Sequence, residues 1–338
     1  RLLLAAPASD VVHVLAGSSW GFFLPLPLAW LLCRLWRRRA VLTCYGPHMA
    51  RFVQRWQRLA WPILRRLDSC AVSSELLQEA FRRHGLEPTL APCVLDMERF
   101  PFRAKSRWQP LLLWSGQLRP EANPTLAVRA LAALHEQLPE TRLLIVGDGP
   151  LASEISKLSR ELGVAEAVSC RPRLALHRWR QAMQTASVLW STAASDDLPA
   201  GLLAAAASGA VIVGTRHGAI GELVEDGVDG LLVEPYDHQA LATATAQVLR
   251  RPILAEGLAH NARLASERYA WPEIRPAIAA LYGRQAPQAA LSARGEQASW
   301  ENADVWPQTE FLWSEPVASA PAPAEPESGP TRSARRRR

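Results

Sequence analysis

Short runs of apolar residues recur along the first 280 residues, and longer segments with helical spacing of apolar positions separate them. The runs are rich in valine, leucine and isoleucine, which is typical of strands covered on both faces of a parallel sheet. Because strands and helices alternate, the pattern predicts an α/β protein with mostly parallel strands. The predicted strands cover residues 11–14, 40–43, 70–73, 90–94, 111–114, 143–146, 168–170, 188–190, 210–213 and 230–233.

Turn and cap residues mark where several of the intervening helices begin and end. Ser74 is a candidate N-cap for a helix that runs to His84 and that Gly85 closes. Pro124 suits the first position of a helix that ends near residue 138. Further helices are expected from the turn at residues 147–150 through residue 162, over residues 202–207 and over residues 239–249.

Residues 20–36 form the most apolar stretch of the chain. The stretch is too short for a membrane-spanning helix, and Pro25 and Pro27 interrupt it. A buried helix is the first interpretation. Contact with a membrane surface is the alternative, because arginine stands at position 34 and at positions 37–39.

The pattern divides the chain into two α/β domains, a closing helix and a tail. Residues 1–108 are predicted to form an incomplete first domain, residues 109–270 a second domain, and residues 271–284 the helix. Residues 285–338 are rich in alanine, proline, serine and glutamate, a composition typical of disorder. A short docking motif is the alternative, because the tail also carries Trp300, Trp306, Phe311 and Trp313.

The composition excludes several classes of protein. With 338 residues, 49% hydrophobic and 21% charged, the chain is neither wholly disordered nor a collagen or coiled-coil rod. Of its 38 basic residues only Lys105 and Lys157 are lysine, so the net charge of +6 reflects an arginine-rich composition rather than a nucleic-acid site. The five cysteines show no C-x-x-C spacing, which favours buried free thiols in a reducing compartment.

Four motifs occur in an order that resembles one enzyme family. Residues 91–100 (APCVLDMERF) resemble a P-N-x-V-D-x-x-R-F linker, with cysteine in place of asparagine. Residues 143–150 (LLIVGDGP), 226–233 (DGVDGLLV) and 268–271 (RYAW) resemble three further segments of that family. Over residues 10–282 the chain is similar to the family-4 retaining glycosyltransferases. This resemblance implies the GT-B fold, in which two Rossmann-like domains with parallel sheets face a cleft.

The resemblance also implies a reaction. It implies transfer of a sugar from a nucleotide-sugar donor to a glycan or lipid-linked acceptor, with retention at the anomeric carbon. It implies no cofactor and no required metal, and no D-x-D motif is evident in a donor loop. We further expect a cytoplasmic protein with peripheral contact at the inner face of a membrane, and no nucleic-acid partner.

The predicted donor site lies on the turns that follow the strands of the second domain. Ligands bind at the carboxyl ends of parallel strands, where N–H groups and helix N-termini stabilise a leaving diphosphate. The resemblance places Asp196 at the first acid of an E-x7-E segment, where it orients the donor sugar. It assigns donor binding to Gly116, Gln117, Arg119, Gly147, Gly149, Asp197, Leu198, Pro199 and Gly218.

Several of these assignments have a purely structural alternative. The two glycines of the 147–150 turn would also serve in a plain strand-to-helix connection. Arg119 would also suit an ordinary surface position, and Asp196 with Asp197 a solvated loop that caps the next helix.

Several positions depart from the family's pattern. Gln117 stands where an arginine is usual, and Ala122 where a lysine is usual. Ala204 replaces the acid that holds the ribose, and Pro172 cannot donate a hydrogen bond near the base. These departures motivate an alternative function, that of a catalytically degenerate glycosyltransferase-like protein that binds or scaffolds a partner.

The first domain offers one candidate on the acceptor side. His48 lies three residues after Tyr45, which takes the place of a histidine in the family, and a surface-loop histidine is the alternative. His13 is expected to be a satisfied core residue within a strand. Nothing corresponds to the family's opening strand and glycine-rich loop, so we expect a fragment or a truncated domain.

Overall fold

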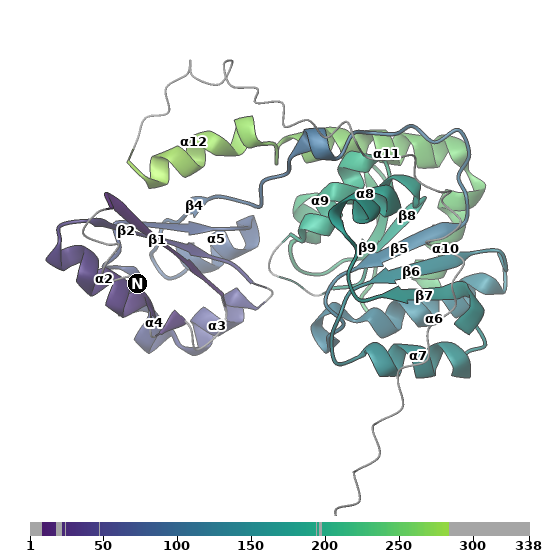
Figure 1. Cartoon of the computed structure of the whole chain (residues 1–338), viewed down its shortest axis with the longest axis horizontal. Helices are drawn as coiled ribbons and strands as arrows, with labels where there is room; N and C mark the ends of the chain where they lie inside the picture. Colours follow the sequence, from purple (N-terminus) through teal and green to yellow (C-terminus); the bar gives the residue numbers. More distant parts are fainter. Residues whose placement is uncertain are drawn as a thin grey trace, which may run out of the picture.

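The computed structural model describes residues 9–17, 22–23, 25–46, 48–193, 195 and 198–283, and it arranges them in two α/β units (Figure 1). One unit holds a four-stranded sheet and the other a six-stranded sheet. Every strand pair in both sheets is parallel, which confirms the predicted fold class. The tail at residues 285–338, predicted to be disordered, lies outside the described residues.

The four-stranded sheet has the order β1-β2-β3-β4 and lies between two layers of helix. Successive side chains of a strand point to opposite faces. Leu42 and Val72 pack into a core with the helices that follow the strands, whereas Val41 and Ala71 pack against Leu281 of the last helix. The elements are β1 (Val11–Ala16), α2 (Pro25–Leu35), β2 (Arg39–Cys44), α3 (Met49–Arg55), α4 (Gln57–Leu64), β3 (Ser69–Val72), α5 (Glu75–Arg82) and β4 (Thr89–Leu90).

The most apolar stretch of the chain forms helix α2, but only one face of that helix is buried. Pro25 and Pro27 do not interrupt it, because they stand in its first turn, where backbone N–H groups have no helical acceptor. Leu28, Leu31 and Leu35 are exposed on the other face. The prediction of a buried helix is therefore wrong for this outer face.

The six-stranded sheet has the order β10-β9-β8-β5-β6-β7. The chain adds β6 and β7 on one side of β5 and then β8, β9 and β10 on the other, so the strand order reverses between β5 and β8. At such a point the loops diverge and leave a crevice at the carboxyl ends of the strands, where ligands bind. The strands are β5 (Leu111–Ser115), β6 (Arg142–Val146), β7 (Val168–Arg171), β8 (Val188–Ser191), β9 (Val211–Thr215) and β10 (Gly230–Val233).

Within the described residues, six longer helices and four short 3-10 helices follow β4 before the last helix of the chain. The long helices are α6 (Pro124–His135), α7 (Ala152–Glu161), α8 (Leu176–Thr185), α9 (Ala200–Ser208), α10 (His238–Arg250) and α11 (Pro252–Glu267). The short ones are η3 (Met97–Arg99), η4 (Pro120–Ala122), η5 (Ala165–Ala167) and η6 (Gly218–Glu222).

One more helix, α12 (Trp271–Leu281), returns from the second unit to the first and covers the second face of the four-stranded sheet (Figure 1). The chain passes between the units twice, after β4 and before α12. These two segments are joined by a hydrogen bond, in which the Leu95 N–H donates to the Tyr269 carbonyl oxygen at 2.8 Å. The His13 ring nitrogens lie 2.8 Å from the hydroxyls of Tyr282 and Thr43, and burial lowers the pKa of His13. His13 is therefore a satisfied structural residue, as predicted, and joins β1 to the end of α12.

Lys105 fastens the linker between the units to the end of α9. Its Nζ donates to the Gly209 carbonyl oxygen at 2.8 Å and lies 5.5 Å from the centroid of the Trp108 ring. Burial lowers the pKa of Lys105 from its ordinary 10.5 to about 8. Between these two pH values the unfolded chain holds a proton that the folded chain has released, so the stability contributed by this group rises with pH.

We therefore expect the parent protein to gain stability over a Lys105→Met variant as the pH rises from 7 to 10. The difference in unfolding free energy should change by up to about 3 kcal/mol. Lys157 is mostly exposed, 3.6 Å from Glu161, so Lys157→Met should show no such change. Denaturant unfolding at three pH values measures both differences, and a flat profile for Lys105→Met would contradict the prediction.

Candidate functional site

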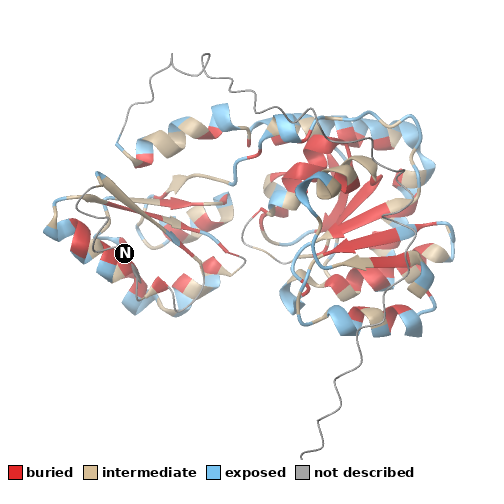
Figure 2. Ribbon diagram, viewed as in Figure 1, coloured by how far each residue is buried: buried red, intermediate tan, exposed pale blue. Residues whose placement is uncertain are grey.

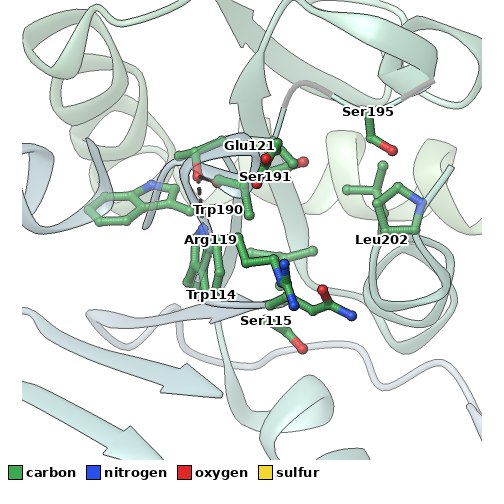
Figure 3. A pocket seen from close by; sticks show the side chains of 15 residues that line it. Trp114, Ser115, Arg119, Glu121, Trp190, Ser191, Ser195 and Leu202 are labelled. Carbon is green, nitrogen blue, oxygen red and sulfur yellow. Dashed lines mark hydrogen bonds between the residues drawn. The ribbon is translucent and has the colours of Figure 1, made fainter. Parts of the chain in front are cut away.

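A pocket of about 270 Å³ opens at the carboxyl ends of β5 and β8, where the strand order reverses. In Figure 3, Trp190 lies on one side of this pocket, Ser195 and Leu202 on the opposite side, and Arg119 between them. Arg119 is the one cationic side chain among the described residues that line the pocket, and Glu121 is the one carboxylate. The remaining polar side chains are Ser115, Gln117, Ser191, Thr192 and Ser195.

Hydrogen bonds hold the tryptophan wall of this pocket in place. The Trp114 indole N–H donates to the Thr192 hydroxyl at 2.8 Å, and that hydroxyl donates to the Ala122 carbonyl oxygen at 2.8 Å (Figure 3). The Trp190 indole N–H donates to the Thr245 hydroxyl at 2.7 Å. Both indole N–H groups are satisfied by threonine hydroxyls, so the two rings are held in a fixed orientation in the pocket wall.

Gly147 and Gly149 shape the pocket from behind rather than line it. A Cβ on Gly147 would overlap the carbonyl oxygen of Gly116, and a Cβ on Gly149 would lie 2.5 Å from the Leu118 carbonyl oxygen. The Leu118 N–H in turn donates to the Asp148 carbonyl oxygen at 2.9 Å. The glycines thus let the loop after β6 approach the loop after β5, while their role in donor binding stays a prediction.

Gly218 likewise permits a close approach of its own loop to the loop between β8 and α9. Its φ is +67°, and a Cβ there would overlap the carbonyl oxygen of Ser195. The Ala219 N–H donates to that same oxygen at 2.8 Å. The predicted donor-site residues Asp196 and Asp197 follow Ser195 directly and lie outside the described residues.

The other two predicted residues of this loop separate in space. Leu198 is buried in the core of the second unit, whereas Pro199 lines the pocket and directly precedes α9. The N-terminal end of α9 therefore opens at the pocket. Because the first N–H groups of a helix lack helical acceptors and its dipole is positive at this end, the position favours a negatively charged ligand.

A second pocket, of about 350 Å³, lies between the two units. His48 and Arg51 line it from the first unit, with the His48 Nδ1 3.2 Å from the Arg51 guanidinium. His217 and Tyr236 line it from the second unit. Glu121 and Thr192 line both pockets, so the two are neighbours.

One carboxylate connects the units directly. Glu222, at the end of η6, accepts hydrogen bonds from the N–H groups of Glu75 at 2.9 Å and Leu76 at 2.8 Å, in the first turn of α5. Ser74 accepts from the Leu77 N–H at 3.2 Å, which confirms it as the N-cap of this helix. Burial raises the pKa of Glu222, against the lowering effect of the two N–H groups.

The second unit matches a family of known proteins. Residues 98–265 match the model of the family described as glycosyl transferases group 1. The chain carries a glycosyl transferases group 1 domain. The group 1 domain contains the whole of the first pocket, from Trp114 to Leu202.

The relatives of this group 1 domain include proteins named D-inositol 3-phosphate glycosyltransferase. The chain is 31% identical over 184 residues to the D-inositol 3-phosphate glycosyltransferase of Actinosynnema mirum, and 28% identical over 179 residues to that of Streptomyces griseus subsp. griseus. The matches cover 52% and 50% of this chain but only 44% and 38% of the relatives' own length.

Two solved structures show that the likeness of fold extends beyond the group 1 domain. The Anabaena Alr3699/HepE structure in complex with UDP matches with a TM-score of 0.71 at 19% identity, over 83% of this chain and 80% of that one. The sucrose-phosphate synthase of Thermosynechococcus elongatus matches with a TM-score of 0.69 at 20% identity, over 82% and 73%. At these identities the likeness establishes the GT-B fold alone.

The structure brings together part of the predicted site and adds residues that were missed. Gly116, Gln117, Arg119 and Pro199 line the pocket of the group 1 domain, while His48 lines the neighbouring pocket. The residues that were missed line the two pockets, several of them at or just after the ends of strands. Their position after a buried strand was the signal in the sequence that could have indicated them. They are Ser115, Glu121, Ser191, Thr192, Arg51, His217 and Tyr236.

Three further observations concern the described part of the chain. No helix there is both long and apolar enough to cross a membrane, and no group of three or more histidine, cysteine, aspartate or glutamate side chains is placed to hold a metal ion. The five cysteines, all within the described residues, are free thiols as predicted, but only Cys33 and Cys44 are buried, and the prediction of burial is wrong for the exposed Cys93. Burial raises the pKa of Cys170 to about 11, so this thiol stays protonated at neutral pH.

Proposed function

We propose that the chain transfers a sugar from a nucleotide-sugar donor to a glycan or lipid-linked acceptor, with retention at the anomeric carbon and without a metal. The observation that carries this proposal is the pocket at the strand reversal of the group 1 domain, where Arg119 and the N-terminal end of α9 both favour negative charge. A cytoplasmic setting with a peripheral contact at the membrane is part of the proposal.

In this proposal the pocket acts on the leaving diphosphate. As the bond between the sugar and the diphosphate breaks, negative charge grows on the diphosphate oxygens. Arg119 and the N–H groups at the start of α9 stabilise that charge more strongly than they stabilise the ground state, which lowers the barrier. Asp196 orients the donor sugar, and the acceptor enters from the second pocket, past His48.

Nucleotide binding is the first test. UDP, GDP and ADP and their common sugar conjugates are titrated against the purified chain while its thermal unfolding is followed. A ligand that binds only the folded state adds about 2.7 kcal/mol of stability at a hundredfold excess over its Kd. We expect one nucleotide class to raise the unfolding temperature, and its sugar conjugate then serves as donor in a transfer assay.

Arg119→Gln tests the role of the cation. The variant should weaken binding of the nucleoside diphosphate by about 10- to 100-fold, because it removes a charged hydrogen-bond donor worth about 1.5–3 kcal/mol. Binding of the matching nucleoside, which has no phosphate, should stay the same. Arg160→Gln, an exposed arginine on α7, is the control, and equal losses for nucleoside and diphosphate would contradict the assigned role.

A second function is favoured by Gln117 and Ala122, which both line the pocket without a positive charge. In that case the protein is a catalytically degenerate relative that binds or scaffolds a partner. A well-folded sample that responds to no nucleotide would support this second function, and turnover of any donor by the unmodified protein would exclude it.

A further inference from the structure

One segment of the first unit holds the whole positive excess of the chain. Residues 11–67 contain nine arginines and no aspartate, glutamate or lysine. This segment therefore carries a charge of +9, and the rest of the chain −3, against +6 for the whole. Summed over the rest of the chain, carboxylates outnumber the basic residues by three.

The fold brings the arginines of this segment together across two helices. The indole N–H of Trp30, on α2, donates to the carbonyl oxygen of Arg66, just after α4, at 3.0 Å. The guanidinium groups of Arg34 and Arg66 lie 5.9 Å and 5.7 Å from the centroid of the Trp30 ring. One cation from α2 and one from the turn after α4 therefore lie near the same aromatic ring.

Exposed leucines lie beside these cations. Leu28, Leu31 and Leu35 are 47%, 56% and 70% exposed, and their spacing places them on one stripe of α2, with Arg34 beside them. On α4, Leu59 is 54% exposed, and Arg66 follows two residues after the end of that helix. Figure 2 shows exposed positions along the outer side of both helices. We call this surface the basic face; it comprises Leu28, Leu31, Arg34, Leu35, Leu59 and Arg66.

We propose that the basic face docks onto a membrane surface that contains anionic lipid. Arginines beside a stripe of leucines are the pattern of a helix that lies in the interface, with its leucines among the acyl chains and its cations at the headgroups. With 11 residues, α2 is too short to cross the bilayer, so it lies in the plane of the interface. Each arginine near an anionic surface contributes about 1 kcal/mol.

Other occupants fit the basic face less well. A second copy of the chain would set the arginines of one basic face against those of the other, with no carboxylate on either face to pair with them. A nucleic acid would pair with the arginines but leave the leucines against water or phosphate. Of these three occupants, the anionic lipid surface is the one that complements both kinds of side chain.

The basic face lies on the side of the small sheet opposite α12 (Figure 1). Helix α3, which follows β2 and precedes α4, carries Arg51 into the pocket between the units. The helix that lines this pocket, α3, therefore directly precedes α4, which carries part of the basic face. This inference deepens the proposed membrane contact, and it stands on its own if the proposed sugar transfer fails.

The test is co-sedimentation of the full chain with vesicles, without nucleotide. We expect binding to vesicles of 30% phosphatidylglycerol in phosphatidylcholine, at least tenfold weaker binding to pure phosphatidylcholine, and a loss of binding as salt rises. Leu31→Ser/Leu35→Ser should lower the affinity for the anionic vesicles at least tenfold, because two leucines no longer enter the acyl region. Arg34→Gln/Arg66→Gln should lower it about tenfold or more.

Matched controls come from the second unit. Ile253 and Leu264 are 88% and 53% exposed on α11, so Ile253→Ser/Leu264→Ser should bind vesicles as the parent does. Thermal unfolding of each variant checks that the fold is kept. Equal binding to neutral and anionic vesicles, full binding by the leucine variant, or no vesicle binding at all would overturn the proposal. If the parent protein were a dimer and Leu31→Ser/Leu35→Ser a monomer, a second copy of the chain would cover this face instead.

Discussion

Replacing Gly147 with alanine is expected to destabilise the protein by about 2–3 kcal/mol or more and to abolish nucleotide binding. The added Cβ would overlap the carbonyl oxygen of Gly116, which is backbone and cannot rotate away as a side chain would. Either the loop after β5 or the loop after β6 must move, at a cost typical of overpacked sites. Because Gly116, Gln117 and Arg119 line the pocket, that movement displaces the proposed diphosphate site.

Gly257→Ala is the matched control for this change. Gly257 lies inside α11, has open space where a Cβ would be placed, and is helical, so alanine there should leave stability unchanged or raise it by up to about 1 kcal/mol. Denaturant unfolding and nucleotide titration measure both variants. If Gly147→Ala matched Gly257→Ala in both assays, the close approach of the two loops would not be essential to the pocket.

Glu222→Ala is expected to loosen the junction between the two units. The change removes the carboxylate that accepts hydrogen bonds from the Glu75 and Leu76 N–H groups. The free energy of unfolding should fall by about 1–3 kcal/mol, since water replaces part of the lost hydrogen bonding. Hydrogen exchange gives a local measurement. The amides of Glu75 and Leu76 should exchange at least tenfold faster, while the Leu77 amide, bonded to Ser74, should change less.

Glu234→Ala provides the comparison for this second change. Glu234 is an exposed carboxylate of the same unit, 3.7 Å from the Arg216 guanidinium, and it makes no contact with α5 that the structure describes. Its removal should leave exchange in α5 unchanged. Unaltered exchange at Glu75 and Leu76 in Glu222→Ala would instead mean that this carboxylate does not hold the junction.

The buried strands of the second unit were predictable because their composition leaves no other interpretation. The runs predicted at residues 143–146 and 210–213 correspond to β6 and β9 within one or two residues, since every position of such a strand is covered on both faces. Helices α3 and α4 were not predicted. They meet at Trp56, where the direction of the helix changes, so the apolar positions on either side do not share one period.

The candidate site was predictable only in outline. The rule that ligands bind at the carboxyl ends of parallel strands predicts a site on the turns of the second unit, and the resemblance to the family added Arg119. The role of Gly147 and Gly218 did not follow, because each accommodates a carbonyl oxygen from a distant loop, and sequence spacing carries no information about that approach. Glu222 was missed for the same reason: its partners stand 146 and 147 positions away.

The return of α12 has a consequence for the order of events during synthesis. His13 and Tyr282, hydrogen-bonded in the finished protein, are 269 positions apart. While the ribosome makes the intervening chain, the side of the small sheet that carries Val41 and Ala71 has no cover. At about 5–20 residues per second, the gap between the two ends lasts on the order of 15–60 seconds. During that time the nascent first unit exposes an apolar surface that chaperones, or neighbouring nascent chains, are able to bind.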